Sequence, residues 1–345
     1  MSVVSGGAAS MPVGGVDGVD AIMRRGGRSL RRRMELTERH LERVTADAGT
    51  PLAEHANATV IAGGKRLRPL LVVLAAECVS EPADVPEAQE RLIRAAVAVE
   101  LVHSATLVHD DLIDGALLRR GRPTVGAVAG RETAVATGDL LFSRAFAELA
   151  LNGDGEQLRA LSDASSALAE GELLQREDCY ATHVPVERYL HRCELKTAAL
   201  FEAACRLGAL SAGGPEELAD ALGGFARRIG LAFQMLDDVL DVSGPVERTG
   251  KPRGTDLLDG TVTLPLILAR ERASELAAFD LRSLRDAGEA EALCERIAAT
   301  GALDEARERA LAVVAEAKEA LPTILPDGRS GLLELVADAV VERYR

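Results

Sequence analysis

Five long proline-free segments constrain the fold of this chain more than any other feature. Alanine, leucine, glutamate and arginine dominate them, and these residue types favour helix interiors, where proline would remove a backbone hydrogen bond. Apolar side chains recur at helical spacing, as at Leu92, Ala95, Ala96, Val99 and Val102, and no alternating β-branched runs stand out. The pattern predicts an all-α protein, a single large helical bundle of about ten or more helices. The segments are residues 87–122, 124–184, 186–214, 216–244 and 266–321.

The N-terminal end reads differently from the rest of the chain. Residues 1–19 are Gly, Ala, Ser and Val without periodicity, so we interpret residues 1–29 as a disordered or weakly ordered segment. The arginines that follow could belong to a transit peptide or a membrane-touching patch, although a solvated start of the first helix is favoured. Residues 30–345 then form one helical domain. Its stretch from Ser243 to Pro265 is long enough to act as a functional lid.

Two aspartate clusters dominate the chemistry. Residues 110–114 and 237–241 both read Asp-Asp-x-x-Asp within apolar helical stretches. Residues four apart share a helix face, so like charges lie close together, and hard divalent cations would relieve that cost. Histidine is scarce and oxygen ligands dominate, which favours Mg²⁺ over Zn²⁺. His103 and Thr106 extend the first polar stripe, and Gln234 joins the second. Two such helices facing each other would form an acidic cavity in the bundle.

Basic residues gather in a few short motifs, although the chain carries a formal net charge of -14. That charge argues against nucleic acid as a partner. Beside acidic metal clusters, forked Arg contacts and Lys point charges indicate a polyphosphate substrate. No nucleophile motif stands out, so metal-assisted loss of diphosphate fits better than attack by the protein. The basic residues are Lys65, Arg66, Arg68, Arg119, Arg120, Lys196 (followed by Thr197) and Lys251.

The remaining composition points to a cytoplasmic protein. The five cysteines form no C-x-x-C pair, which is typical of reduced thiols. No uninterrupted apolar run reaches the length of about 18 residues that would predict a transmembrane segment.

Taken together, these motifs resemble the trans-isoprenyl (polyprenyl) diphosphate synthase family, and the match covers about residues 30–345. The resemblance implies an all-helical homodimer with a central active-site cavity, of isoprenoid synthase type. It also implies a prenyltransferase that joins isopentenyl diphosphate to an allylic diphosphate. The matching motifs are Gly63-Gly64-Lys65-Arg66-Leu67-Arg68-Pro69, Leu107-Val108-His109-Asp110-Asp111, Arg119-Arg120-Gly121-Arg122-Pro123-Thr124, Lys196-Thr197 and Phe233-Gln234-Met235-Leu236-Asp237-Asp238-Val239-Leu240-Asp241.

The resemblance also implies a role for each motif residue, with about three Mg²⁺ ions per active site. The metal ligands would be Asp110, Asp114 and Asp237, assisted by Asp111, Asp238 and Asp241. Isopentenyl diphosphate would be held by Lys65, Arg68, His103 and Arg120, and the allylic diphosphate by Arg119, Lys196, Thr197, Gln234 and Lys251. Many relatives carry a second loop lysine where this chain has Thr261, so one diphosphate contact differs.

The resemblance implies that Ala105 and Thr106, which precede the first cluster, help to set the length of the product. A rise of about 1.5 Å per residue places Ala105 roughly 7–8 Å from the metal site, where bulky residues in short-chain relatives block the tunnel. A small alanine predicts a product of about C30 to C50, such as a quinone side chain. Phe142 or Phe146 would supply the tunnel floor, with plain core packing as an equal alternative.

Three alternatives stay open at this point. A short-chain synthase making geranylgeranyl or farnesyl diphosphate is the nearest. A class I terpene cyclase would also use an Asp-rich motif, but the chain has no Trp and only 3% aromatic residues to stabilise cations. A non-catalytic partner subunit of a two-component synthase is expected to lose its aspartates, whereas both clusters are complete.

Overall fold

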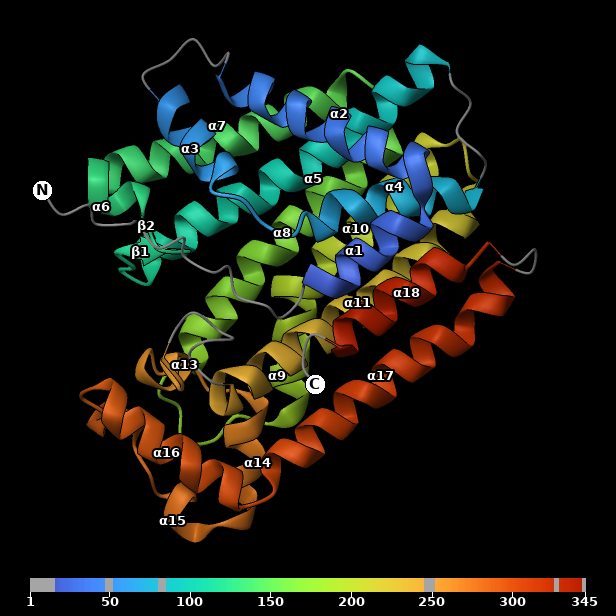
Figure 1. Ribbon diagram of the computed structural model, residues 1–345. Helices are drawn as coiled ribbons and strands as arrows, with labels where there is room; N and C mark the ends of the chain where they lie inside the picture. Colours follow the sequence, from blue (N-terminus) through green and yellow to red (C-terminus); the bar gives the residue numbers. More distant parts are fainter. Residues whose placement is uncertain (1–15, 47–51, 80–84, 245–251, 326–328, 343–345) are drawn as a thin grey trace, which may run out of the picture.

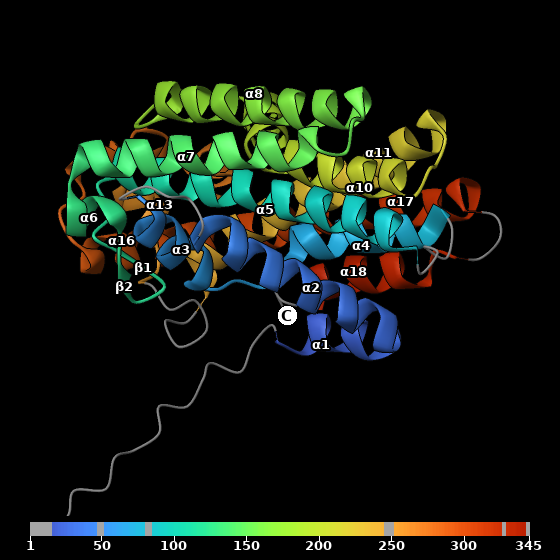
Figure 2. The same ribbon diagram turned by 90° about the horizontal axis from the view of Figure 1, so that it is seen from above.

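The computed structural model describes residues 16–46, 52–79, 85–244, 252–325 and 329–342. The fold is all-α, as predicted, with long helices packed in layers. Figure 1 shows α5 (teal) running through the middle of the bundle, and α13 to α16 gathered at one end. Turned by 90°, Figure 2 places α7 and α8 along one edge and α1, α2 and α18 toward the other.

The described part of the first half of the chain contains eight α-helices. They are α1 (Val16–Arg25), α2 (Gly27–Ala46), α3 (Ala53–Ile61), α4 (Leu67–Val79), α5 (Pro86–Ile113), α6 (Val125–Ala129), α7 (Arg131–Ala150) and α8 (Gly155–Asp178).

The second half adds eleven helical elements among the described residues. They are α9 (Val186–Cys193), the π-helix η1 (Glu194–Ala198), α10 (Ala199–Ser211), α11 (Glu216–Ser243), α13 (Thr255–Leu258), α14 (Leu264–Arg272), α15 (Ser274–Ala277), the 3-10 turn η2 (Leu281–Ser283), α16 (Ala287–Ala299), α17 (Ala302–Ile324) and α18 (Gly331–Glu342), with η1 continuous with its neighbours.

The core lies where α4, α5, α10 and α11 meet. α4 buries every residue from Pro69 to Ala76, and α5 buries every residue from Ala95 to Val102. Helices that are apolar all round belong in a protein interior. α10 packs against α4, α5, α8 and α11, and α5 packs against α2, α4 and α7. These buried helices fix the position of both aspartate clusters, which lie at the C-terminal ends of α5 and α11.

The N-terminal segment differs from the expectation of disorder over part of its length. Residues 16–25 form α1, and α2 begins at Gly27, whereas residues 1–15 lie outside the described part of the chain. Ile22 and Leu30 are fully buried, and a side chain at Gly18 would come within 2.6 Å of Ala339 on α18. A few well-placed apolar side chains therefore anchor α1 on α18 despite the Arg-rich surroundings.

A small β-hairpin follows the first aspartate cluster, where helices alone were expected. β1 (Leu118–Arg119) pairs with β2 (Arg122–Pro123) in antiparallel register. The two turn residues, Arg120 and Gly121, have φ of 53° and 73°. Two-residue turns with positive φ at both positions match the natural twist of a hairpin. The turn thereby presents Arg119 and Arg120 at the end of α5.

A π-helical turn, η1, interrupts the run from α9 to α10 at Lys196 and Thr197. π-turns are rare and often occur at functional sites. Close packing surrounds this one: a Cβ at Gly171 on α8 would lie 2.6 Å from the Lys196 backbone nitrogen, and one at Gly230 on α11 would lie 2.8 Å from Ala198 Cα. Two glycines thus let α8 and α11 approach the turn from both sides.

Candidate active site

Two connected cavities occupy the centre of the bundle. The acidic cavity, about 300 Å³, is lined by aspartates from α5, α11 and the segment around α13. The basic cavity, about 820 Å³, is lined by basic residues just before and at the start of α4, by others that follow α5, and by apolar residues of α8, α10 and α11. Both are bordered by Leu107, Asp110, Arg119, Lys196, Thr197, Gln234 and Asp237, so they form one continuous space.

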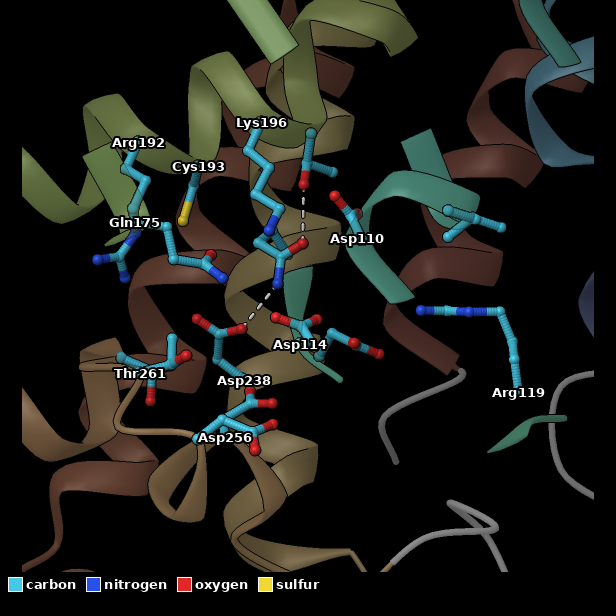
Figure 3. A pocket seen from close by; sticks show the side chains of 16 residues that line it. Asp110, Asp114, Arg119, Gln175, Arg192, Cys193, Lys196, Asp238, Asp256 and Thr261 are labelled. Carbon is cyan, nitrogen blue, oxygen red and sulfur yellow. Dashed lines mark hydrogen bonds between the residues drawn. The ribbon is translucent and has the colours of Figure 1, made fainter. Parts of the chain in front are cut away.

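The acidic cavity brings the two predicted clusters together. Figure 3 shows Asp110 and Asp114, from the end of α5, near Asp238 of α11 and Asp256 of α13, with Lys196 at the top of the view. Opposite charges already neutralise part of this wall. Asp114 is ion-paired with Arg176. Lys196 is ion-paired with Glu172, which also accepts from Arg176 Nε at 3.0 Å.

Burial shapes the protonation of the aspartates in this cavity. It raises the pKa of Asp110 to about 6; Lys196 opposes the shift, and the carboxylates of Glu172 and Asp114 add to it. Burial also raises the pKa of Asp238 to about 8, with repulsion from Asp256 adding to the shift. Raised pKa values mean that the ionised forms are short of positive partners, as expected of a site that receives a cation.

Two members of the aspartate clusters point elsewhere. Asp111 is buried and accepts from Arg119 Nε at 2.7 Å, and it lines a separate small cleft beneath the hairpin. Asp241 is also buried, and its Oδ2 accepts the backbone amide of Asp256 at 3.2 Å. It is not among the residues that line the acidic cavity. The geometry thus suits Asp111 and Asp241 for holding the hairpin and the α13 segment in place.

The donor set fits Mg²⁺, although the carboxylates are not preassembled around an ion. Within the described ranges, no three Asp, Glu, His or Cys side chains lie close enough to hold a metal ion. The oxygens of Asp110, Asp114 and Asp237 nevertheless line one cavity, and hard divalent cations take oxygen ligands. Mg²⁺ also keeps waters and substrate phosphates as ligands, so carboxylates from facing helices need not complete its shell alone.

The basic cavity collects every predicted substrate-binding residue that the structure describes. Lys251 lies outside the described residues. The Arg68 guanidinium stacks 5.0 Å from the centre of the Phe201 ring, and the Arg120 guanidinium packs on Gly64. The other lining residues from that set are Lys65, His103, Arg119, Lys196, Thr197 and Gln234.

Arg66 organises the segment that carries Lys65 and Arg68. It adopts a left-handed φ of 47°, which is costly for a residue with a Cβ. Its guanidinium donates to Glu38 Oε1 at 2.6 Å, to Glu100 Oε1 at 2.7 Å and to the Val60 carbonyl at 2.8 Å. These contacts hold the strained turn.

Burial, together with nearby positive charge, lowers the pKa of two basic residues in the basic cavity. Burial, followed by repulsion from Arg68 and Arg120, holds the pKa of His103 well below its usual value of 6.5. Burial also lowers the pKa of Arg68 to about 10, against the attraction of Glu100. His103 is therefore a neutral imidazole near pH 7, able to donate one hydrogen bond without adding charge.

The residues expected to set product length are not all at the cavity. Thr106 lines the basic cavity. Ala105 is fully buried and lies outside both linings. Phe142 and Phe146 pack half-buried against the core, with the Phe142 ring 6.0 Å from that of His109. The apolar end of the basic cavity is formed by Leu168, Leu200, Phe201 and Phe233.

Several site residues escaped the sequence analysis. Glu172, Gln175 and Arg176 share one face of α8 at spacings of three and four, a periodic signal that was available. Asp256 and Asp259 lie in the expected lid and line the acidic cavity beside Thr261. For Tyr189 and Arg192, which contact the cavity walls from α9, nothing local in the sequence marks a role. Their importance comes from tertiary contacts alone.

Two compositional expectations can be compared with the structure. All five cysteines are free thiols. By length and composition α5 is the one helix in the described residues that could cross a membrane, but 72% of its most apolar window is buried inside the protein. A buried core helix passes the same test.

Comparison with known proteins gives a consistent answer. Residues 50–299 match the sequence profile of the polyprenyl synthetase family. The chain is 44% identical over 232 residues to heptaprenyl diphosphate synthase component 2 of Geobacillus stearothermophilus, covering 67% of this chain and 71% of the relative. It is 38% identical over 290 residues to geranylgeranyl diphosphate synthase of Methanosarcina mazei, covering 82% and 87%.

A solved structure agrees over nearly the whole chain. The decaprenyl diphosphate synthase of Rhodobacter capsulatus superimposes with a TM-score of 0.84 at 31% identity, covering 95% of this chain and 99% of that one. The relatives thus differ widely in the product that their names state.

Proposed function

Because this chain belongs to the polyprenyl synthetase family and is a trans-prenyl diphosphate synthase, we propose that it condenses isopentenyl diphosphate with an allylic diphosphate. The proposed product is a long-chain all-trans polyprenyl diphosphate of about C30 to C50, a precursor for a quinone side chain. The observation that carries the proposal is the junction of an acidic and a basic cavity at Asp110, Lys196 and Asp237. One space then holds two diphosphates with their carbon ends adjacent.

Each cavity suits one substrate. The allylic diphosphate belongs in the acidic cavity, where Arg119, Lys196 and Thr197 bind its oxygens. Asp110, Asp114 and Asp237 would hold Mg²⁺, which would supply positive charge to stabilise the diphosphate leaving group. Isopentenyl diphosphate belongs in the basic cavity, bound by Lys65, Arg68, His103 and Arg120. A neutral His103 donates a hydrogen bond there.

The reaction follows from this placement. The allylic C–O bond breaks, the isopentenyl double bond attacks the resulting cation, and a proton leaves the new C–C adduct. No side chain of the basic cavity stands out as a base at the carbon end, and the released diphosphate is the proposed proton acceptor. Leu168, Leu200 and Phe233 give the growing hydrocarbon an apolar wall.

Incubation with farnesyl diphosphate and labelled isopentenyl diphosphate, followed by chromatography of the products, tests chain length. Products of about C30 to C50 are expected. The relatives named geranylgeranyl, heptaprenyl and decaprenyl diphosphate synthases make this the open part of the function. A product no longer than geranylgeranyl diphosphate would replace the long-chain assignment with a short-chain one.

The metal requirement is tested separately. Chelation should abolish activity and added Mg²⁺ should restore it. Asp110→Asn and Asp237→Asn should each lower kcat by about 100-fold or more, since each removes a ligand charge from the cation site. Asp163→Asn is the matched control, because Asp163 is exposed on α8 far along the helix from the cavity. Equal activity of the Asp110 variant and the control would contradict the metal assignment.

The second candidate is a subunit of a two-component enzyme. It is favoured by the name of one relative, which calls that protein component 2. The purified chain, supplied with Mg²⁺ and both substrates, distinguishes the two. Turnover by the chain alone supports the single-component enzyme, and an inert chain supports the partner requirement.

We also propose that the enzyme is a cytoplasmic homodimer. Helices α7 and α8 form one edge of the bundle (Figure 2). Support for the dimer comes from exposed apolar side chains on these elements, since Leu173 on α8 is 66% exposed and Leu151, which follows α7, is 64% exposed. Light scattering should give twice the monomer mass, and Leu173→Asp should lower it. Fractionation of cells producing the tagged chain tests the location.

A further inference from the structure

A chain of hydrogen bonds crosses the floor of the acidic cavity. Thr197 Oγ1, on the π-turn η1, donates to Gln234 Oε1 at 2.8 Å. Gln234 Nε2, on α11, donates to Asp238 Oδ1 at 2.8 Å (dashed in Figure 3). Tyr189 Oη, on α9, donates to Asp238 Oδ2 at 2.7 Å. Each Asp238 oxygen therefore has a donor, from α11 and α9, and Gln234 extends the chain of contacts to η1.

The Tyr189 hydroxyl is the most deeply buried part of this chain of contacts. Tyr189 is 0% exposed and Asp238 is 3% exposed. A buried carboxyl group is costly in either protonation state unless hydrogen bonds reach it, and the Tyr189 hydroxyl supplies one of them. The Cys193 thiol is the hydroxyl's other polar neighbour, and it cannot replace an O–H donor of that strength.

Packing of the three elements does not depend on that hydroxyl. At Gly230, α11 approaches η1 so closely that a Cβ would lie 2.8 Å from Ala198 Cα and 3.0 Å from the Phe201 side chain. The Tyr189 ring is itself held beneath the Arg192 guanidinium, 5.4 Å from its centre. Arg192 is anchored by Asp178 at 3.1 Å and by the Val262 carbonyl at 2.6 Å. Loss of the hydroxyl alone should therefore leave the helices in place and free the carboxylate to turn.

We propose that Tyr189 is a positioning residue for the diphosphate end of the acidic cavity. Its hydroxyl fixes the Asp238 carboxylate, and Asp238 in turn fixes Gln234 and Thr197, which border both cavities. The inference rests on the proposed function for its biological meaning, since it assigns the anchored residues to the allylic diphosphate. It adds a residue on α9 that lines neither cavity to the machinery that orients that group.

The test compares two tyrosine variants of the full chain. Tyr189→Phe removes the hydroxyl and keeps the ring. Tyr180→Phe is the matched control, because its ring packs on Gly260 and under Arg282 and no hydrogen bond of its hydroxyl occurs among the described contacts. Calorimetry with inorganic diphosphate in excess Mg²⁺ should show about tenfold weaker binding to Tyr189→Phe, the scale of one buried hydrogen bond. Tyr180→Phe should bind as the wild type does.

Two further readouts separate positioning from a general structural role. The KM for isopentenyl diphosphate, which occupies the basic cavity, should stay within about twofold in Tyr189→Phe while kcat falls about tenfold. Combining Tyr189→Phe with Asp238→Asn should weaken diphosphate binding no more than Asp238→Asn alone, because the hydroxyl acts through that carboxylate. Fully additive effects, or equal changes for both substrates, would overturn the proposal.

The outcomes are distinguishable from failure of the proposed function. Diphosphate binding requires no turnover, so it reports on Tyr189 even if the wild-type chain makes no product. If Tyr189→Phe does not fold, as judged by circular dichroism, Thr197→Val breaks the same chain of contacts at its far end. The same weakening is then expected, and unchanged diphosphate binding in that variant would exclude the relay.

Discussion

Arg119 Nε lies 2.7 Å from Asp111 Oδ1, so the β-hairpin is fastened to the first aspartate cluster. The contact uses one edge of the guanidinium, and Arg119 also borders both cavities. One arginine thus joins the turn after α5 to the place assigned to the allylic diphosphate. The planar guanidinium of arginine can donate hydrogen bonds to a carboxylate and a phosphate at the same time, whereas the ammonium of lysine is a compact point charge.

Arg119→Lys should therefore raise the KM for the allylic substrate by about tenfold, or about 1.4 kcal/mol, while changing the KM for isopentenyl diphosphate less. Steady-state kinetics with each substrate varied in turn provide the measurement. Arg122→Lys, an exposed position on β2, is the control. Identical kinetics for the two variants would mean that Arg119 only braces the hairpin.

Product length offers a test of side-chain direction. Thr106→Phe should shorten the main product, because Thr106 borders the basic cavity. Ala105→Tyr, the change that the sequence alone favours, places a large ring at a fully buried position and should mainly lower the thermal midpoint. Overpacking of this kind costs about 1–3 kcal/mol. Chromatography and thermal denaturation of both variants separate the effects; a shorter product from Ala105→Tyr at unchanged stability would restore Ala105 as the tunnel residue.

The neutral His103 predicts a pH-dependent stability. Its folded-state pKa is well below 6.5, so as pH falls past 6.5 the unfolded chain takes up a proton that the folded chain does not. Stability should then fall by about 1.4 kcal/mol per pH unit from this group, and His103→Gln should remove that part of the loss between pH 7.5 and 5.5.

Only the comparison with the variant isolates this effect. Asp110, with a pKa raised to about 6, acts in the opposite direction, since the folded chain binds its proton more readily as pH falls. Urea unfolding at the two pH values measures the difference. His191→Gln, exposed on α9, is the control. Parallel slopes for wild type and His103→Gln would show that His103 is charged in the folded chain.

Gly171 should tolerate no side chain. A Cβ there would lie 2.6 Å from the Lys196 backbone nitrogen, so Gly171→Ala must push α8 away from the π-turn. We expect a loss of about 1–3 kcal/mol in the free energy of unfolding together with a lower kcat. Gly155→Ala on the same helix has open space and should be neutral or stabilising by up to about 1 kcal/mol. Equal behaviour of the two would mean that the close approach is not required.

The parts of the fold and site that the sequence predicts depend on residues close together in the chain. The aspartates at i and i+4 and the proline-free segments are short-range features, and the helices carrying the aspartates form as expected. Neighbouring residues on a helix differ by about 100°, and so Thr106 reaches the cavity where Ala105 does not. The number of residues from the cluster gives the distance along the helix, but it does not say which side of the helix faces the cavity.

The contacts that sequence reasoning missed join residues far apart in the chain. Asp241 belongs to the second motif, yet its carboxylate accepts a hydrogen bond from the backbone amide of Asp256, 15 residues further along the chain. Arg176 meets Asp114 across 62 residues, and Tyr189 meets Asp238 across 49. No spacing rule anticipates such pairs, because they depend on how α8 and α9 lie against the finished cavity.

The π-turn at Glu194–Ala198 restricts which changes in chain length this protein can accept. Removing one residue between Tyr189 and Phe201 would restore α-helical winding and rotate Lys196 by about 100° relative to α9. The segment is therefore fixed in register as well as in composition. Insertions and deletions among homologous sequences should be absent from it.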